Sequence, residues 1–223
     1  GVKEIPRNVF LNCTSLTSIT IGNDVTHIAR EAFRGCTALE KVVILDGVTT
    51  IDRDAFIYCT GLKEVSIGNG VKSIGRWVFS GCTALEKVTL GNGVTSIGSE
   101  AFEDCVSLPA IVLPDSITTI ESSLFRGCSA LKEVGIGNRV TSIESNAFTG
   151  CSALEEITIP QSVESIGVSA FYDCSQLKKV NIGTGVTSIG TDAFLGTAIY
   201  NNPTNWQNGA LYIGDYLIKV QAD

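Results

Sequence analysis

The sequence predicts a repeat solenoid, in which short parallel strands from successive coils stack along one axis. Two observations carry this prediction: the cysteines and the phenylalanines each recur at a constant interval of 23 residues, with no insertion or deletion. The cysteines are Cys13, Cys36, Cys59, Cys82, Cys105, Cys128, Cys151 and Cys174. The phenylalanines are Phe10, Phe33, Phe56, Phe79, Phe102, Phe125, Phe148, Phe171 and Phe194. Each interval is therefore one coil, numbered here from the coil that begins at Cys13, and each coil completes its core against its neighbours.

The sequence of every coil predicts the same elements in the same order. The coil that begins at Cys59 is an example. Leu62–Ile67 alternates apolar and polar residues and is expected to form a short strand. Residues 68–70 (Gly-Asn-Gly) form a turn, because these residues tolerate positive φ, and Val71–Ile74 is a second extended piece. Residues 75–81 are too few for a full helix, so one α- or 3₁₀-helical turn is expected there, with Phe79 directed inward. Parallel stacking of such coils gives a rise of about 4.8 Å per coil.

The repeating unit resembles the BspA-type leucine-rich repeat. Two steps carry the resemblance, C-x-x-L-x-x-[VI]-x-[IL] and I-x-x-x-A-F-x-x-C, and the second is seen at Ile97–Cys105 and Ile143–Cys151. The order differs from the commoner leucine-rich pattern, because here the cysteine precedes the leucine. The resemblance covers residues 1–196 and implies a leucine-rich-repeat superhelix. Similar proteins occur among bacterial surface and secreted proteins and in some protists, and several are implicated in adhesion to host or matrix proteins and to other bacteria.

The two ends of the repeat differ from its middle. Residues 1–12 match the second half of a coil, eight full coils occupy 13–196, and Thr197 stands where the next cysteine is due. Residues 197–223 are expected to form a loop and a β-hairpin that caps the last coil or begins a next segment. The aromatic residues expected to lie across the open end are Trp206, Tyr212 and Tyr216. Because the chain starts in mid-coil without a polar cap, we expect a fragment of a longer polypeptide whose signal peptide lies upstream, and self-association through this uncapped coil.

Composition disfavours several classes of function. The chain has 23 Asp+Glu against 16 Lys+Arg, for a net charge of −7, so nucleic acid and anionic lipid surfaces are not expected partners. It holds no apolar run long enough to cross a bilayer. The single histidine, His27, has no nucleophile or carboxylate fixed beside it by the pattern, so we expect a solvated histidine, no enzyme activity and no cofactor.

The eight cysteines are expected to form a buried column of reduced thiols. Equivalent positions in stacked coils have parallel Cα–Cβ vectors about 4.8 Å apart, whereas a disulfide needs converging Cβ atoms about 3.8 Å apart. A straight column also lacks the four converging donors of a zinc site, so no bound metal is expected. The sequon Asn12-Cys13-Thr14 is interpreted as accidental, because Cys13 belongs to this core column.

Charged residues follow the leucine in most coils, on the face formed by the first strands, whereas coil one has Thr17-Ser18 there. Their signs alternate through coils two to four, which read Glu40-Lys41, Lys63-Glu64 and Glu86-Lys87. Neighbouring strands then form favourable lateral pairs, so a solvated ladder that resists strand slippage explains these charges. Coil five interrupts the ladder with Pro109, Ala110 and Val112, an uncharged and mildly apolar spot that is a candidate contact surface.

The turn between the second extended piece and the next cysteine carries a second candidate surface. Arg30, Arg53 and Arg76 occupy one column in three successive coils, with Tyr58 and Trp77 close by in the motif. Exposed Trp, Tyr and Arg are enriched at interface hot spots, so these five residues are predicted to bind a partner. We call them the arginine–aromatic surface. The alternative is that the acidic residue following each of the first two arginines neutralises it and that Trp77 merely packs along its neighbour.

These observations favour a non-enzymatic binding module, and the resemblance implies an adhesin-like part of a larger cell-surface or secreted bacterial protein. Its rigid face would bind a host, matrix or bacterial protein, or a glycan. The other hypothesis is a passive spacer that carries further domains, which the near-identical coils favour. An extracellular location is expected, and an intracellular scaffold stays open because free thiols suit a reducing compartment equally well.

Overall fold

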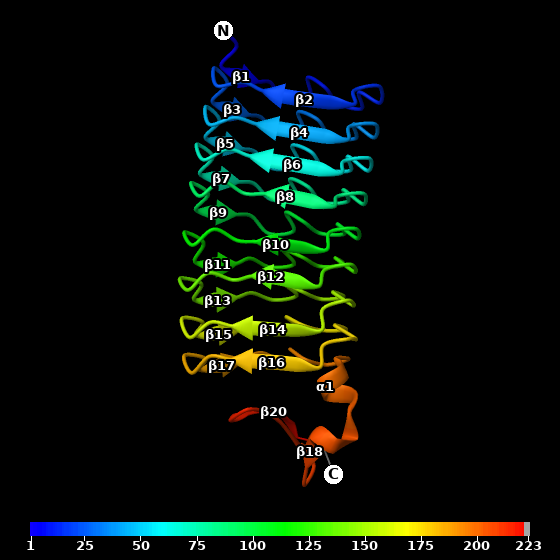
Figure 1. Ribbon diagram of the computed structural model, residues 1–223, viewed down its shortest axis with the longest axis vertical. Coiled ribbons are helices and arrows are strands. Elements are labelled where there is room, and N and C mark those ends of the chain that lie inside the picture. The colour runs from blue at the N-terminus through cyan, green and yellow to red at the C-terminus, as the bar shows by residue number, and fades with distance from the viewer. Residues whose placement is uncertain (221–223) are drawn as a thin grey trace.

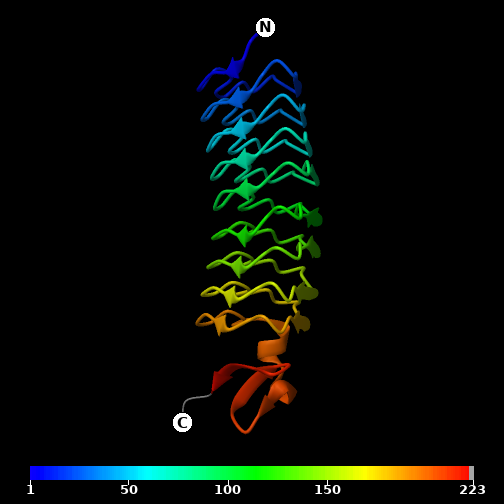
Figure 2. The same cartoon turned by 90° about the vertical axis from the view of Figure 1, so that its left-hand side faces the viewer.

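The computed structural model describes residues 1–220, whose coils stack in a nearly straight column (Figures 1 and 2). The first strands of the coils are β2 (Ser18–Ile21), β4 (Lys41–Ile44), β6 (Glu64–Ile67), β8 (Lys87–Thr89), β10 (Ala110–Val112), β12 (Glu133–Gly135), β14 (Glu156–Ile159) and β16 (Lys179–Ile182). The two-residue strands are β1 (Glu4–Ile5), β3 (His27–Ile28), β5 (Thr50–Ile51), β7 (Ser73–Ile74), β9 (Ser96–Ile97), β11 (Thr119–Ile120), β13 (Ser142–Ile143), β15 (Ser165–Ile166) and β17 (Ser188–Ile189). Strands of each kind pair in parallel, which confirms the predicted solenoid.

Strand pairs adopt the register that the 23-residue repeat dictates, so equivalent side chains stack on one another. Lys41 pairs with Glu64 and Val42 with Val65. The phenylalanine rings form one continuous stack through the column, with neighbouring centroids between 4.8 and 5.8 Å apart. The cysteines are unpaired and form the predicted column, buried except for the half-buried Cys13. A typical buried thiol, that of Cys59, donates to the carbonyl oxygen of Phe33 at 3.1 Å.

The turn segment differs in detail from its prediction. It is a run of hydrogen-bonded turns rather than one α- or 3₁₀-helical turn, because its amides alternate between two kinds of acceptor. The N–H groups of Ala32 and Arg34 donate three residues back along the chain. Those of Phe33 and Gly35 donate to carbonyl groups of the following coil. The alternation prevents a helical ladder within the segment and ties this edge of each coil to the next.

Both strand columns are interrupted between coils four and five. Strand β8 does not pair with β10, nor β9 with β11, and the first-strand column has a further gap between β12 and β14. Pro109 removes one hydrogen bond at the gap beside β10. At the equivalent position of coil four, the N–H of Glu86 donates to the carbonyl of Lys63 at 2.9 Å, and proline has no N–H to do the same. The turn edge continues across the gap, for example from the N–H of Phe102 to the carbonyl of Leu124 at 3.1 Å, so the column stays joined.

A small antiparallel sheet follows the last coil. The chain forms α1 (Ala198–Asn201), the 3₁₀ turn η1 (Pro203–Asn205), and the strands β18 (Trp206–Gln207), β19 (Ala210–Ile213) and β20 (Tyr216–Val220). Leu211 and Ile213 join the core, and the hydroxyl of Tyr216 donates to the carbonyl of Gly183 at 2.9 Å. Tyr212 does not lie across the core as expected but is 46% exposed, because side chains alternate along β19 and Leu211 takes the inward face.

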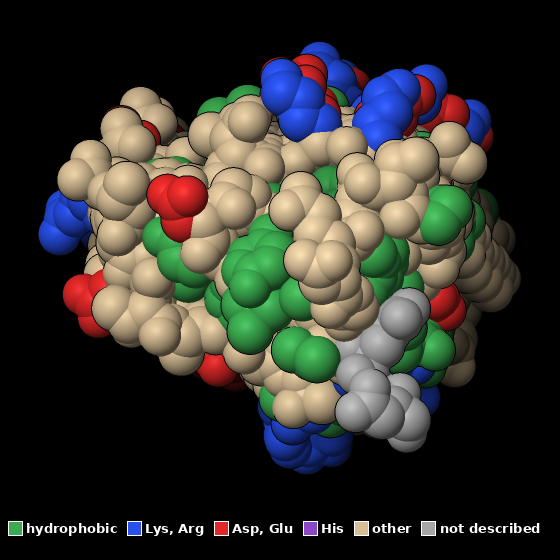
Figure 3. Space-filling model, turned by 90° about the horizontal axis from the view of Figure 1, so that it is seen from below, with side chains coloured by type: hydrophobic (Ala, Val, Ile, Leu, Met, Phe, Trp, Pro, Cys, Tyr) green, Lys and Arg blue, Asp and Glu red, His purple; other side chains and the backbone are tan. Residues whose placement is uncertain are grey.

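Apolar side chains gather at the centre of this end of the molecule (Figure 3). The last three positions of the predicted C-terminal segment, 221–223, lie outside the described residues. At the opposite end, Val2 is 63% exposed. Phe10 is only half-buried, although its ring stacks on that of Phe33. The partial coil of residues 1–12 therefore presents apolar surface at the N-terminal end of the column.

Candidate functional site

Two columns of residues on the turn edge adopt the left-handed backbone conformation with positive φ. The first column holds Asn8, Glu31, Asp54, Trp77, Glu100, Ser123, Asn146, Ser169 and Asp192. The second holds Asn12, Gly35, Tyr58, Gly81, Asp104, Gly127, Gly150, Asp173 and Gly196. Trp77, with φ 57°, and Tyr58, with φ 59°, are the aromatic members. Two of the five residues of the arginine–aromatic surface therefore occupy backbone positions that disfavour bulky side chains.

This conformation is unfavourable for a large side chain. The left-handed region costs an L-residue about 1–2 kcal/mol, which Gly avoids and which short polar residues such as Asn reduce. Residues held in sparsely populated conformations cluster at binding and catalytic sites. The aligned repeats carried a signal of this, because most equivalents of Tyr58 are Gly, Asn or Asp and most equivalents of Trp77 are small or acidic.

Tyr58 and Trp77 line one hollow of about 380 Å³ together with Arg30. The sequence did not single out several other residues that line it, namely Arg34, Ile57, Ser80 and Glu103. The ring of Tyr58 packs closely on Gly81 of the next coil, where an added Cβ would lie 2.5 Å from the ring. The guanidinium carbon of Arg34 lies 6.0 Å from the centre of the same ring. The hollow thus joins aromatic surface to fixed charges from four successive coils.

Arg76 contacts both the ring of Trp77 and the carboxylate of Glu100. Its guanidinium carbon lies 3.7 Å from the centre of the Trp77 ring, a cation–π contact. Its Nε and Nη2 donate to the two carboxylate oxygens of Glu100 at 2.8 and 2.9 Å. This bidentate pair raises the pKa of Arg76. Arg76 is therefore permanently charged and fixed beside the indole.

Arg30 belongs to a cluster of opposite charges around Glu31. This buried carboxylate lies 3.2 Å from Arg7, Arg30 and Arg34. Burial alone would raise the pKa of Glu31, but the three guanidinium groups together lower it. Arg30 also lies 3.4 Å from the buried carboxylate of Asp54. Local neutralisation, the alternative explanation of the arginine column, therefore does apply to Arg30.

Arg53 stands apart from the other two arginines. Its side chain is exposed, does not line the hollow, and makes no ion pair or hydrogen bond with any residue in the described part of the chain. The structure thus brings Arg30, Tyr58 and Trp77 together directly and adds Arg76 through its stacking on Trp77. Arg53 lies outside this assembly as an exposed positive charge in the same column.

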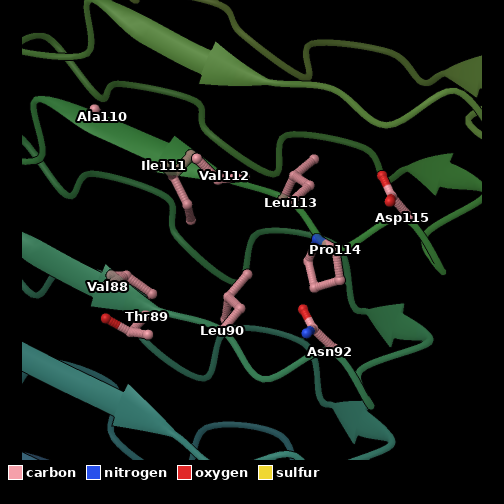
Figure 4. A pocket seen from close by; sticks show the side chains of 10 residues that line it. All are labelled: Val88, Thr89, Leu90, Asn92, Ala110, Ile111, Val112, Leu113, Pro114 and Asp115. Atoms are coloured by element: carbon pink, nitrogen blue, oxygen red, sulfur yellow. The ribbon is translucent and has the colours of Figure 1, made fainter.

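A second hollow lies on the strand face, at the gap between β8 and β10 (Figure 4). We call it the coil-five groove. Its volume is about 420 Å³, and the apolar residues that line it include Val88, Leu90, Ile111, Val112, Leu113 and Pro114. Among the coil-five residues predicted from the sequence, Ala110 and Val112 line the groove, whereas Pro109 only opens it. Val112 is 74% exposed, which is unusual for a large aliphatic side chain.

The remaining titratable groups offer little chemistry. His27 is not simply solvated, because its Nε2 lies 3.0 Å from Asp52 and its Nδ1 lies 3.7 Å from Glu4. Burial raises the pKa of Cys82 and Cys128 to about 12, which keeps both thiols protonated. Within residues 1–220, no three His, Cys, Asp or Glu side chains gather in a group that could hold a metal ion. Over the same range, no helix is long and apolar enough to cross a membrane.

Parallel strands, a 23-residue coil and almost no helix define a leucine-rich repeat solenoid. More specifically, the chain belongs to the BspA-type leucine-rich repeat family. The family description, BspA type leucine rich repeat region (6 copies), matches residues 3–109 and 95–219. Members of this class are generally non-enzymatic repeat proteins, and the fold is often used for protein interaction.

This chain is also similar to several solved structures. A leucine rich repeat protein from T. pallidum is 34% identical to this chain, with a TM-score of 0.64, and the match covers 69% of this chain and 72% of that one. A leucine-rich repeat protein from Eubacterium ventriosum is 24% identical, with a TM-score of 0.60 over 87% of this chain and 62% of that one. A leucine rich cell surface protein from Faecalibacterium prausnitzii is 26% identical, with a TM-score of 0.39 over 87% and 80%. Among curated proteins, no significant match was found.

Proposed function

We propose that this chain is a protein-binding module and that the arginine–aromatic surface on coils one to three binds the partner. The observation that carries the proposal is the conformation of Trp77 and Tyr58, two bulky side chains kept at left-handed positions where the other coils have small, polar or acidic residues. A structural role does not explain this choice, because smaller residues build the same turn in the other coils. Aromatic rings beside fixed arginines are the composition of interface hot spots.

The charges of the arginine–aromatic surface indicate the chemistry of the partner that it would bind. Arg30 and Arg76 are already paired with carboxylates, so they supply orientation and hydrogen-bonding groups rather than net charge. Arg53 is the exposed cation of the column and makes no ion pair with the described residues. The partner is therefore a protein surface with apolar or aromatic side chains for the hollow and a carboxylate opposite Arg53.

The wider role that we propose is that of an adhesin-like module in a larger cell-surface or secreted bacterial protein. The support is membership of the BspA-type family, whose resemblance implies such a setting. A glycan ligand is the variant of this proposal in which the aromatic rings stack on sugar.

A passive spacer is the second candidate function, and the strand face favours it. There, ion pairs run from coil to coil, with Lys41 and Lys87 at 2.9 and 3.0 Å from Glu64. Such ladders hold the register of the stack and present a charge-balanced, solvated surface. A spacer requires no left-handed aromatic residue, which is why binding is the preferred function.

Binding of the purified chain to immobilised matrix, plasma and bacterial-surface proteins tests the proposal. We expect at least one partner with a Kd below about 1 μM, or about −8 kcal/mol. Trp77→Asn and Arg53→Glu are expected to weaken that interaction. Ser169→Asn is the matched control, since Ser169 occupies the left-handed column of Trp77 four coils away. Binding that survives both surface variants would place the site elsewhere, and no binding to any protein would favour the spacer.

A further inference from the structure

The first charged column of the strand face is antisymmetric about coil five. Along the solenoid it reads Glu40, Lys63, Glu86, Pro109, Lys132, Glu155 and Lys178. Positions at equal distances on either side of Pro109 therefore carry opposite charges in all three cases. Within one chain this arrangement has no effect, because residues that far apart along the column do not meet.

The antisymmetry brings opposite charges together when the strand face of a second copy of the chain packs against that of the first. If a two-fold axis that runs along β10 relates the two copies, the coils of the second copy run in the opposite order to those of the first. Each charged column of one copy then faces the same column of the other copy. Glu86 of one copy then meets Lys132 of the other, and the two outer positions of the column pair in the same way. In the second charged column, Lys87 meets Glu133.

Farther from the axis, the second column brings like charges together. The positions that face each other there are Glu64 with Glu156 and Lys41 with Lys179. All four are already held in ion pairs within their own copy, between Lys41 and Glu64 at 2.9 Å and between Lys179 and Glu156. Each of these four charges therefore has an opposite charge of its own copy beside it, which reduces the repulsion across the interface.

Of the four charges nearest the axis, Lys87 pairs with Glu64 in its own chain at 3.0 Å, whereas the other three have no such partner among the described residues. In the part of the chain that the structure describes, Glu86, Lys132 and Glu133 make no ion pair within 4.0 Å. The reason is that coil five places Pro109 and Ala110 where its neighbours have Lys or Glu. The two-fold arrangement therefore gives each of these three charges a partner of opposite sign in the other copy.

The apolar surface of the face is concentrated on the same axis. The coil-five groove opens there, and Val112 stands beside it with 74% of its side chain exposed. On the two-fold axis, Val112 meets its own equivalent, so both copies bury this side chain over the groove. A core of aliphatic contact flanked by charge pairs is the usual anatomy of a protein interface.

We infer that two copies of this chain associate antiparallel through their strand faces, about a two-fold axis at coil five. The face from coil two to coil eight is about 29 Å long at about 4.8 Å per coil, which gives an interface at the small end of specific complexes. The dimer is therefore reversible and salt-sensitive. The arginine–aromatic surface lies on the turn edge and stays free, so the dimer presents two copies of it.

Sedimentation equilibrium of the chain, from about 10 to 500 μM and at about 20 and 500 mM NaCl, tests this inference. A monomer–dimer equilibrium that weakens at high salt is expected, with the dimer at twice 23.6 kDa. Glu86→Lys should raise the Kd about tenfold, because two repulsive contacts replace two attractive ones. Glu164→Lys, an equal charge change on the exposed second strand column, should leave the Kd unchanged.

The rescue experiment decides the geometry. Glu86→Lys combined with Lys132→Glu should restore the Kd to within about threefold of the parent, because the swapped charges face each other again. In a parallel dimer Glu86 would meet Lys87 instead, and the second change would rescue nothing. A monomer throughout the range, a dimer indifferent to Glu86→Lys, as association through the N-terminal coil would be, or a failed rescue would each overturn the inference.

Discussion

Replacement of Trp77 by asparagine should leave the fold nearly as stable as before while it removes binding. This combination distinguishes a side chain kept for recognition from one kept for packing. The residue is well suited to the experiment because the first turn-edge column contains asparagine at Asn8 and Asn146, in the same left-handed conformation. The substituted chain therefore has a precedent for the new residue in its own coils.

The expected change in the free energy of unfolding is the sum of one stabilising and two destabilising contributions. Asparagine relieves about 1 kcal/mol of the left-handed cost that Trp77 bears. Loss of the stacking contact with Arg76 removes about 0.5–1 kcal/mol, and loss of the buried part of the half-buried indole removes about 1 kcal/mol more. The net loss is about 0.5–1 kcal/mol, which corresponds to about 1–4 °C in Tm for a chain of this size.

Urea unfolding followed by circular dichroism measures this difference, with Phe79→Ala as the reference for a structural residue. Phe79 is fully buried between Phe56 and Phe102, each at 5.5 Å between ring centroids, so its truncation should cost about 3–5 kcal/mol. If Trp77→Asn instead costs more than about 2 kcal/mol, the indole is a packing residue. The main support for the proposed binding surface would then be gone.

Three further outcomes follow from the structure. Under native conditions a maleimide reagent should modify only the half-buried Cys13, since the other thiols are buried, and mass spectrometry should count eight modified thiols after denaturation. The pKa of Glu31 lies below its ordinary value of 4.5, so its ion pairs stabilise the fold above that pH and are lost as the pH falls through the lowered pKa. The Glu31→Gln variant should therefore be less stable than the parent by about 1–3 kcal/mol at pH 7, and the difference should shrink in acid titrations monitored by thermal unfolding. Pro109→Thr restores the missing N–H opposite the carbonyl of Glu86, so amide hydrogen exchange in β10 should slow by about tenfold, and unchanged exchange would show that proline is not what separates the strands.

The periodic part of the structure could be predicted from the sequence because each feature depends only on residue spacing. Equivalent residues 23 positions apart must stack if the coils are parallel, so the phenylalanine column, the thiol column and the strand register all follow from counting. The candidate site was predicted in part for the same reason, since Arg30, Tyr58 and Trp77 lie in neighbouring coils. Other features depend on acceptors in an adjacent coil, which the spacing of one coil does not reveal. The turn segment is not helical because half of its N–H groups donate to carbonyl groups of the adjacent coil. Tyr212 faces solvent because side chains alternate along β19 and Leu211 occupies the inward position.

By itself the sequence determined the solenoid, its 23-residue coil and the positions where coils differ, because a strict repeat converts position in the chain into position in space. Only the tertiary structure decided how those differences act. The left-handed backbone of Trp77, the pairing of Arg76 with Glu100 and the gap beside Pro109 each arise between neighbouring coils. Backbone conformation and ion pairing there depend on which groups of the adjacent coil lie within reach, and that distance is set by packing.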